Sequence, residues 1–296
     1  MTGRGTTLVE LVVALVLFAI VSVSVYGLLL RGERIYRRQS QRVALSATLR
    51  AGVTILSAEL QGLSAAGSAG SDIAEMAPAA LTYRAPRSLH FACRPPQVTG
   101  SSSGTLVVAA DPWFGLRAHD PARDSVLVFA EADPTSDSDD YWLRASVSAA
   151  PRGGTGCPEG GKSLSIPVTG ISPRDALKDV WPGAPVQGFE LVRIYAYPDG
   201  RGDWWVGARS SAKGGGWRQT QPVFGPIASS GLRFSYYDTN GGVATAPQQV
   251  ARIGVTVIGR SSEAVRSVAG TTVHHVDSLT TQISLRNVRQ LGAERS

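Results

Sequence analysis

The chain has 296 residues, of which 43% are hydrophobic and 18% are charged, so it can bury a core and is not a wholly disordered polymer. Its 33 glycines follow no triplet period, which excludes collagen, and its two cysteines exclude a disulfide-dense scaffold and a four-cysteine zinc site. A formal charge of +6 is compatible with nucleic acid, with an anionic membrane or with no specific partner.

A long apolar segment lies close to the amino terminus. Residues 11–30 contain no charged side chain, and twenty helical residues extend about 30 Å, the hydrocarbon thickness of a bilayer. A secretory signal peptide would have a shorter apolar stretch followed by a small-residue cleavage site. Arg31, Glu33 and Arg34 stand at that place instead. The sequence therefore predicts a membrane-spanning helix that stays in the protein.

One carboxylate, Glu10, precedes this apolar run directly. Inside a bilayer an ionised carboxylate is costly and usually has a partner. Glu10 either marks the interfacial edge of the helix or pairs with a cation. If the chain began at Thr6, Glu10 would lie within about two helical turns of a free amine.

The residues around Glu10 resemble a known processing signal. The heptapeptide GTTLVEL at 5–11, preceded by a leader with Arg4 and followed by an apolar run, resembles the type IV prepilin signal of type IV pilins and type II secretion pseudopilins. The resemblance implies that a prepilin peptidase cuts on the cytoplasmic side between Gly5 and Thr6 and methylates the new terminus. Thr6 stands where this family usually has phenylalanine.

The same resemblance implies an assembly role for Glu10, the fifth residue after the cut. There it would neutralise the terminal amine of a neighbouring subunit, and one carboxylate–ammonium contact offsets two desolvation penalties. The implied partners are other pilins or pseudopilins through the helix, the prepilin peptidase and the inner membrane. The resemblance divides the chain into a leader at 1–5 and a transmembrane helix at 6–30.

The charges after the span favour an orientation in the membrane opposite to the one that the resemblance implies. Between residues 31 and 42, five arginines against one glutamate give +4, which the positive-inside rule places in the cytoplasm. The resemblance implies that the residues after the span are exported. We adopt that orientation because the cysteines and the head suit an exported domain. Residues 1–62 hold seven arginines and three glutamates, which leaves +2 for the rest. The arginines then form a solvated or headgroup-facing collar, and direct nucleic-acid binding is not expected.

The helix is predicted to continue after the span. Apolar residues recur at three- and four-residue steps from Ile35 through Val43 to Leu63, and no proline precedes Pro78. The pattern predicts an amphipathic continuation over 31–64 and one helix of about 85 Å from Thr6 to Leu63. Small residues at 64–71 are predicted to end it and to lead to a globular head at 65–296.

The head is predicted to be rich in antiparallel strands because its apolar residues alternate with period two. Alternation predicts strands at 89–93, 188–197, 232–236, 253–257 and 279–285, and continuous apolar runs predict buried strands at 106–108 and 126–129. Turn residues at 198–200 and 238–242 predict two hairpins. The fold class is therefore α+β, a long helix packed on a mainly antiparallel sheet, which is also the type IV pilin-like fold that the resemblance implies.

The last strands extend the resemblance. Segments 231–238, 250–257 and 281–287 look like the final strands of J-type minor pseudopilins and PilW-like minor pilins, whereas 100–217 resembles nothing we can name. The large head also suits a minor subunit. We therefore expect a minor pilin or pseudopilin, first in the inner membrane with its head in the periplasm and then at a filament or pseudopilus tip. The alternative is a single-pass, membrane-anchored binding or adhesion protein that acts outside a filament.

Other candidate sites are weaker. In an oxidising periplasm Cys93 and Cys157 are expected to form a disulfide, whose closed loop of about 65 residues stabilises the fold by about 4 kcal/mol. Four carboxylates could bind calcium, but the glycine and the downstream glutamate of an EF-hand loop are absent, so a solvated acidic loop is favoured. This acidic loop contains Asp133, Asp137, Asp139 and Asp140.

Neither histidines nor nucleophiles indicate catalysis. The four histidines, His90, His119, His274 and His275, lack metal-ligand spacing, and the sequence has no nucleophile elbow, phosphate loop or dinucleotide fingerprint. We therefore expect no catalytic residue, no cofactor and no enzyme activity. Three tryptophans could line a binding face, although strand aromatics usually pack in a core. They are Trp204, Trp205 and Trp217.

Overall fold

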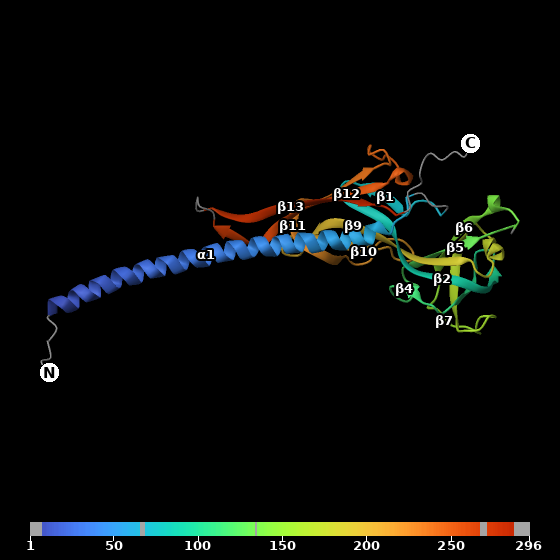
Figure 1. Ribbon diagram of the computed structural model, residues 1–296. Helices are drawn as coiled ribbons and strands as arrows, with labels where there is room; N and C mark the ends of the chain where they lie inside the picture. Colours follow the sequence, from blue (N-terminus) through green and yellow to red (C-terminus); the bar gives the residue numbers. More distant parts are fainter. Residues whose placement is uncertain (1–7, 66–68, 134, 267–270, 287–296) are drawn as a thin grey trace.

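The computed structural model of the protein describes residues 8–65, 69–133, 135–266 and 271–286, and it has an α+β architecture. A single long helix, α1 (Leu8–Gln61), runs from the amino-terminal end of the molecule onto a large antiparallel sheet (Figure 1). The predicted long helix and strand-rich head are both confirmed. Thr6, the predicted start of the helix, lies outside the described residues.

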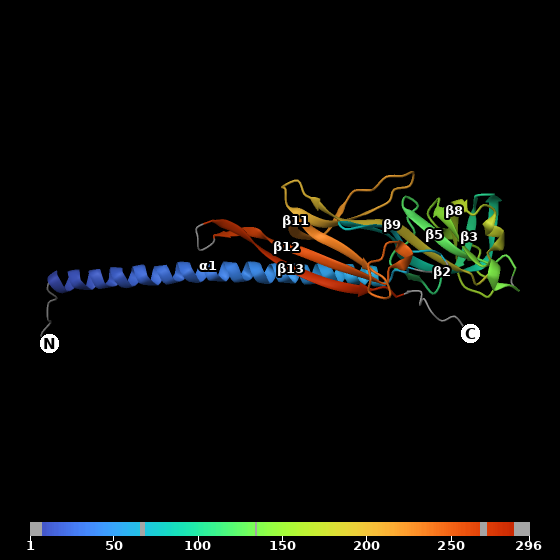
Figure 2. The ribbon, with the colours of Figure 1, turned by 90° about the horizontal axis from the view of Figure 1, so that it is seen from above.

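Helix α1 has two different halves. Its apolar side chains from Leu8 to Leu30 are exposed, whereas Leu45, Leu49 and Leu56 are buried against the sheet. Only the second half lies alongside the strands, and the first projects beyond them (Figure 2). The predicted apolar stripe is therefore wrong at its start. Ile35 and Val43 are 56% and 69% exposed because the helix meets the sheet only from Leu45 onward.

Each of the seven predicted strands overlaps a strand of the structure, and the described residues contain six further strands that were not predicted. In chain order the strands are β1 (Ile73–Ala77), β2 (Ala80–Gly100), β3 (Ser103–Ala109), β4 (Phe114–Gly115), β5 (Asp124–Ala130), β6 (Tyr141–Val147), β7 (Arg152–Gly153), β8 (Ser163–Ser172), β9 (Pro185–Pro198), β10 (Trp204–Ser210), β11 (Gln221–Tyr237), β12 (Arg252–Arg266) and β13 (Thr272–Ser284). Three short 3₁₀ helices are η1 (Asp137–Asp139), η2 (Ala176–Asp179) and η3 (Pro247–Gln249).

One part of the head is a sheet covered by the helix. It contains β1, the first half of β2, the second half of β9 and then β10 to β13 in order. Helix α1 packs on β11, β12 and β13. Two glycines permit this close contact. A Cβ at Gly52 would lie 2.6 Å from the Phe224 ring, and one at Gly259 would lie 2.6 Å from Leu45 Cδ1. We call this part the helix-covered sheet.

The other part of the head is a closed barrel, which the sequence did not predict. Neighbouring strands pair in the order β2, β3, β8, β6, β5 and β9, and β9 then pairs with β2, so the ring closes. Fully buried apolar side chains such as Leu106, Val126, Leu143 and Ile166 fill its interior. Leu177 of η2 adds to this second core. Small barrels are filled by side chains in this way and enclose no channel.

Two long strands connect the barrel to the helix-covered sheet. Residues 80–84 of β2 pair with 191–195 of β9 in the sheet, and residues 88–91 pair with 185–188 in the barrel. The register shifts between Pro86 and Ser88, so Arg87 occupies a bulge at the junction. A bulge bends the strand and changes the direction of a side chain. Arg87 is thereby placed where the helix, the sheet and the barrel meet.

Both predicted hairpins are present, but the second has a longer connection than its turn residues indicate. In the first, β9 and β10 pair antiparallel, and Asp199 accepts hydrogen bonds from the amides of Arg201 and Asp203. In the second, β11 and β12 also pair antiparallel, and Asp238 Oδ1 accepts hydrogen bonds from two amides of the turn at 238–242. Because β12 starts only at Arg252, after η3, the connection extends well beyond that turn.

Candidate functional site: the long helix and the ionic network at its end

The first half of α1 carries the predicted assembly residue. Glu10 lies in the first turn of the helix and is exposed, whereas Gly5 and Thr6, the predicted processing residues, lie outside the described residues. Within the described residues α1 is the one helix long and apolar enough to cross a membrane, and its most apolar stretch has no buried residue. Leu8 and Phe18 are 79% and 70% exposed.

This exposed surface is unusual for a water-soluble monomer. A helix that is apolar on every side is normally covered by lipid or by other helices. Helix α1 turns polar near residue 31, where Glu33 and Arg37 form an exposed ion pair four residues apart. An exposed pair contributes little to stability. These charges therefore mark the end of the apolar stretch but add little to the stability of the helix.

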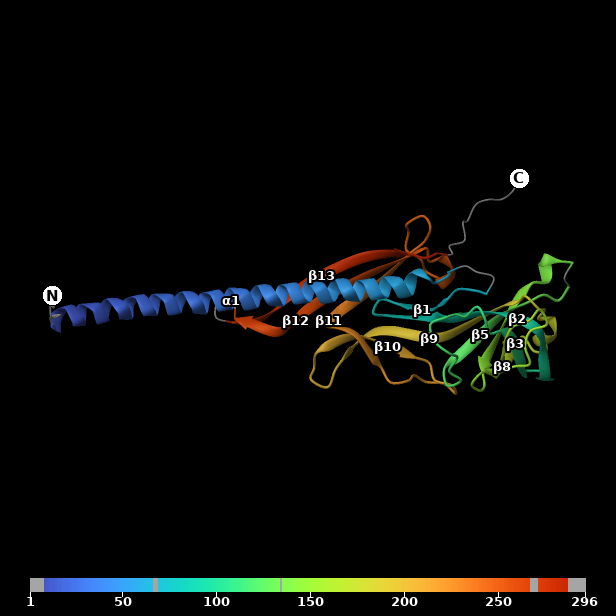
Figure 3. The ribbon, with the colours of Figure 1, turned by 60° about the horizontal axis from the view of Figure 1, so that its bottom comes forward.

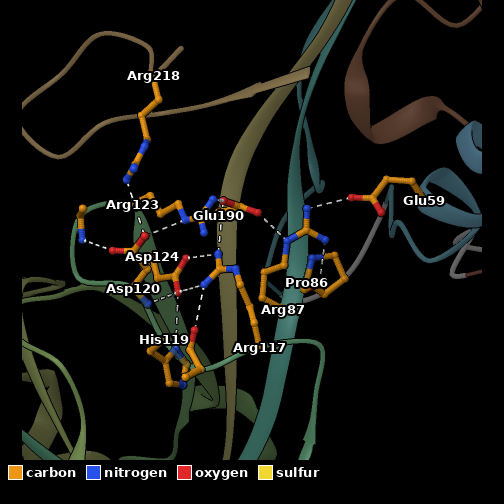
Figure 4. A network of polar contacts seen from close by, with 12 residues as sticks. Glu59, Pro86, Arg87, Arg117, His119, Asp120, Arg123, Asp124, Glu190 and Arg218 are labelled. Carbon is orange, nitrogen blue, oxygen red and sulfur yellow. Dashed lines mark hydrogen bonds and ion pairs between the residues drawn. The ribbon is translucent and has the colours of Figure 1, made fainter. Parts of the chain in front are cut away.

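The second half of α1 ends in a network of buried and half-buried charges, drawn in Figure 4. Glu59 of α1 accepts a hydrogen bond from Arg87 Nη2 at 2.9 Å, and Glu190 of β9 accepts one from Arg87 Nε at 2.6 Å. Tyr83 donates its hydroxyl to Glu59 over 3.3 Å. The bulged arginine therefore joins the helix to β9. We call these residues, together with three charged residues on the barrel side, the ionic network. Its members are Glu59, Tyr83, Arg87, Glu190, Arg117, Arg123 and Asp124.

The barrel side of the ionic network is centred on Arg117. Asp124 and Glu190 face each other across the β5–β9 pair, where like charges repel. Arg117 lies between them and donates to both oxygens of Asp124 at 2.7 Å, while its Nη2 is 3.2 Å from Glu190 Oε2. Arg123 Nη1 is 3.4 Å from the same Glu190 oxygen. Each buried carboxylate is thus compensated by at least one arginine.

Burial and pairing shift the pKa values of the ionic network. Burial opposes the charged form of Arg87, but hydrogen bonds to Glu190 and Glu59 outweigh it and raise the pKa. Hydrogen bonds to Asp124 raise the pKa of Arg117 despite partial burial. Burial, then the charge of Glu59, raises the pKa of Tyr83 far above 10. The arginines therefore stay charged and the tyrosine stays neutral at physiological pH.

His119 is the neutral member beside these charges. Its side chain is 1% exposed, with Nδ1 4.0 Å from Asp124 Oδ2 and Nε2 3.2 Å from Ser88 Oγ. Burial, and then the neighbouring His90, lower its pKa to about 4. The rings of His90 and His119 are 5.4 Å apart, and Trp113 packs edge-on against His90 at 5.0 Å. Sequence spacing alone did not indicate this cluster.

The predicted disulfide is present. Cys93 of β2 and Cys157, in the segment between β7 and β8, are joined with their Cα atoms 5.5 Å apart. The bond fastens that segment to the wall of the barrel. It closes a loop long enough to stabilise the fold by about 4 kcal/mol in the chain-entropy model.

The acidic loop uses its carboxylates within the loop itself. Asp133 Oδ1 accepts hydrogen bonds from the amide and the hydroxyl of Thr135, and Asp139 Oδ2 accepts one from the amide of Asp133. The loop also contains Asp140, and the Asp137 side chain lies outside the described part. In residues 8–65, 69–133, 135–266 and 271–286, no three His, Cys, Asp or Glu side chains are placed to hold a metal ion.

The three tryptophans do not form one face. Trp204 packs against the core of the helix-covered sheet, while Trp205 donates Nε1–H to Asp199 at 3.2 Å. Trp217 lies under the guanidinium of Arg209, 5.0 Å from its centre. In the hairpin of β12 and β13, His274 Nδ1 is 2.7 Å from the Ser261 carbonyl oxygen. These side chains therefore serve separate local contacts.

Comparison of the chain with models of protein families, with curated proteins and with solved structures gives no match.

Proposed function

We propose that the chain is a minor pilin or pseudopilin. As such it would be a structural subunit that, after prepilin-peptidase cleavage between Gly5 and Thr6, joins or primes the assembly of a type IV pilus or a type II secretion pseudopilus. The observation that carries this proposal is the division of α1 into an exposed apolar half and a half packed on the head. A subunit that leaves a membrane for a helix-packed filament needs such a division, because its apolar half exchanges lipid for neighbouring helices.

The amino-terminal sequence supports the same proposal. GTTLVEL at 5–11 has the form of a prepilin signal, and Glu10 lies in the first described turn of α1. An ammonium at Thr6 and a carboxylate at Glu10 of a neighbouring subunit would neutralise each other in a low-dielectric environment. The proposed mechanism therefore needs helix packing and one charge contact, and no bond-making chemistry in the head.

Mass spectrometry of the mature amino terminus tests the proposal. We expect purified membrane-extracted protein to begin with methylated Thr6. Gly5→Val should block cleavage and leave Met1 in place, whereas Gly3→Val, two residues earlier in the same leader, should be processed normally. An intact Met1 in the wild type, or a cut near Arg31, would overturn the proposal.

A membrane-anchored binding or adhesion protein is the second candidate. It is favoured by three apolar side chains near β4, on the outside of the barrel, where Trp113, Phe114 and Leu116 are 42%, 49% and 77% exposed. Exposed apolar patches often mark contact surfaces. The same mass spectrum separates the candidates, because an anchored protein that acts alone would keep its leader and remain outside sheared filaments.

A further inference from the structure

A pocket of about 370 Å³ opens on the flank of the head beside the ionic network. Four arginines and one carboxylate line it, together with glutamine and serine side chains. The charged residues are Arg87, Arg123, Arg209, Arg218 and Glu190. A cavity with this excess of guanidinium groups has a positive potential, and its low-dielectric walls strengthen it. We call it the arginine pocket.

The carboxylate in the arginine pocket is already neutralised. Glu190 Oε1 accepts from Arg87 at 2.6 Å, and Oε2 lies 3.2 Å from Arg117 and 3.4 Å from Arg123. Three positive groups thus share one negative charge. Arg87 also pairs with Glu59, and Arg123 with Asp120. These arginines have structural partners, so they hold the pocket wall but do not by themselves indicate a ligand.

The two remaining arginines are not accounted for by such pairs. Arg218, whose side chain is 44% exposed, reaches Asp120 only at 3.6 Å, and that carboxylate already pairs with Arg123. In the part of the chain that the structure describes, no carboxylate lies within ion-pair distance of Arg209, and its buried Nε has no hydrogen-bond acceptor. A buried donor without an acceptor is costly.

Arg209 is nevertheless held in place. Its guanidinium lies over the Tyr195 ring at 4.7 Å and over the Trp217 ring at 5.0 Å. Stacking on aromatic rings orients the planar group and leaves its N–H edges available for oxygen acceptors. A prearranged, uncompensated guanidinium at a pocket wall is what an oxyanion site requires, because the ordering cost is already met before binding.

We propose that the arginine pocket binds a phosphate group, held by Arg209 and Arg218, as the free ion or as a small phosphate monoester. Guanidinium forks donate two parallel hydrogen bonds to phosphate oxygens, and such charge-assisted bonds are among the strongest polar contacts in proteins. A volume of about 370 Å³ is larger than one phosphate ion needs, so the organic part of an ester also fits. This site is independent of the function proposed for α1.

Calorimetry on the full chain in detergent tests the site. The probes are inorganic phosphate and glycerol 3-phosphate, with sodium chloride at the same ionic strength as the control for screening. We expect saturable binding of at least one phosphate probe to the wild type. Tighter binding of the ester would identify a monoester as the ligand class, and equal binding would identify the free ion.

One double variant and one control distinguish a specific site from general attraction to the protein's positive charge. Arg209→Gln combined with Arg218→Gln should weaken binding at least about tenfold, the effect of losing charge-assisted bonds. Arg233→Gln removes an exposed arginine of β11 outside the pocket and should change affinity less than twofold. The proposal is overturned if chloride reproduces the phosphate signal, or if the double variant binds as the wild type does.

Arg218→Gln alone keeps the test decisive if the double variant unfolds. That side chain is partly exposed and makes only a 3.6 Å contact, so the fold should survive its loss. Circular dichroism checks this, and an affinity at least about threefold weaker supports the site. Unchanged affinity in this folded variant would overturn it.

Discussion

Arg87 shows how one irregular residue can determine a buried charge network. Its strand neighbours pair with Phe189 and Gly188 of β9, but the bulge leaves Arg87 unpaired in the ladder. The freed side chain reaches both Glu59 on the helix and Glu190 on β9. Removing one member of a buried ion pair costs about 3–5 kcal/mol, since the other charge stays buried. Arg87 therefore links the end of α1 to β9 through one carboxylate on each element.

His119 should make the stability of the head depend on pH. The folded protein holds its pKa near 4, because burial and His90 disfavour the proton, whereas a histidine in the unfolded chain titrates near 6.5. Between these values the unfolded state binds a proton that the folded state does not. The free energy of unfolding therefore falls as pH falls through this window, by about 3 kcal/mol in full.

Unfolding of the full chain in detergent from pH 7 to pH 4 measures this effect. We expect the wild type to lose about 3 kcal/mol more than His119→Gln, which keeps a polar group near Ser88 but cannot be protonated. Comparing the two proteins cancels the contributions of the titrating groups that do not interact with His119. Equal pH slopes would show that His119 does not carry the dependence.

At the scale of elements, the contact between α1 and β11 depends on the absence of a side chain. Gly52 lies in the packed half of the helix, and a Cβ there would be 2.6 Å from the Phe224 ring. Gly52→Ala gains about 1 kcal/mol of helix propensity, but overpacking typically costs about 1–3 kcal/mol. We expect a net loss in the free energy of unfolding.

The matched control is Gly32→Ala, on the same helix with nothing within 4 Å of its Cβ position. It gains the same propensity without a clash, so its thermal unfolding midpoint should equal or exceed that of the wild type. Thermal unfolding followed by circular dichroism compares the two variants. A Gly52→Ala midpoint as high as that of Gly32→Ala would contradict the proposed packing.

Local sequence patterns predicted many of the strands but not the closure of six strands into a barrel. Alternating apolar residues located β9, β11 and β12, because a half-buried strand needs that period, and continuous apolar runs located the buried strands β3 and β5. The barrel closes through pairs such as Leu89 with Gln187, which lie 98 residues apart (187 minus 89). No local period encodes such a partner. Separation along the chain also hid the contact of Arg87 with Glu190, 103 residues apart, and the position of His119 beside His90, 29 residues apart.

At the scale of the whole molecule, the exposed apolar half of α1 and the barrel lie at opposite ends. The exposed apolar half of α1 extends from one end, and the barrel lies at the other, beyond the helix-covered sheet (Figure 3). The arginine pocket is lined by residues of the head, and the ionic network joins the head to the far end of α1 at Glu59, whereas Glu10 lies in the first turn of that helix. Folding of the head and insertion of the helix should therefore respond to different residues.

Glu10→Val provides the test of that separation. Packing of α1 on the head begins at Leu45, so this variant should keep the wild-type unfolding midpoint and should still insert in the membrane. If Glu10 neutralises the amine of a neighbour, its loss leaves a buried charge at a cost of about 3–5 kcal/mol. Since 1.4 kcal/mol corresponds to a factor of ten, incorporation into sheared filaments should fall at least about tenfold. Glu33→Gln, a carboxylate beyond the apolar half, should assemble normally, whereas equal incorporation of Glu10→Val and the wild type would exclude the charge contact.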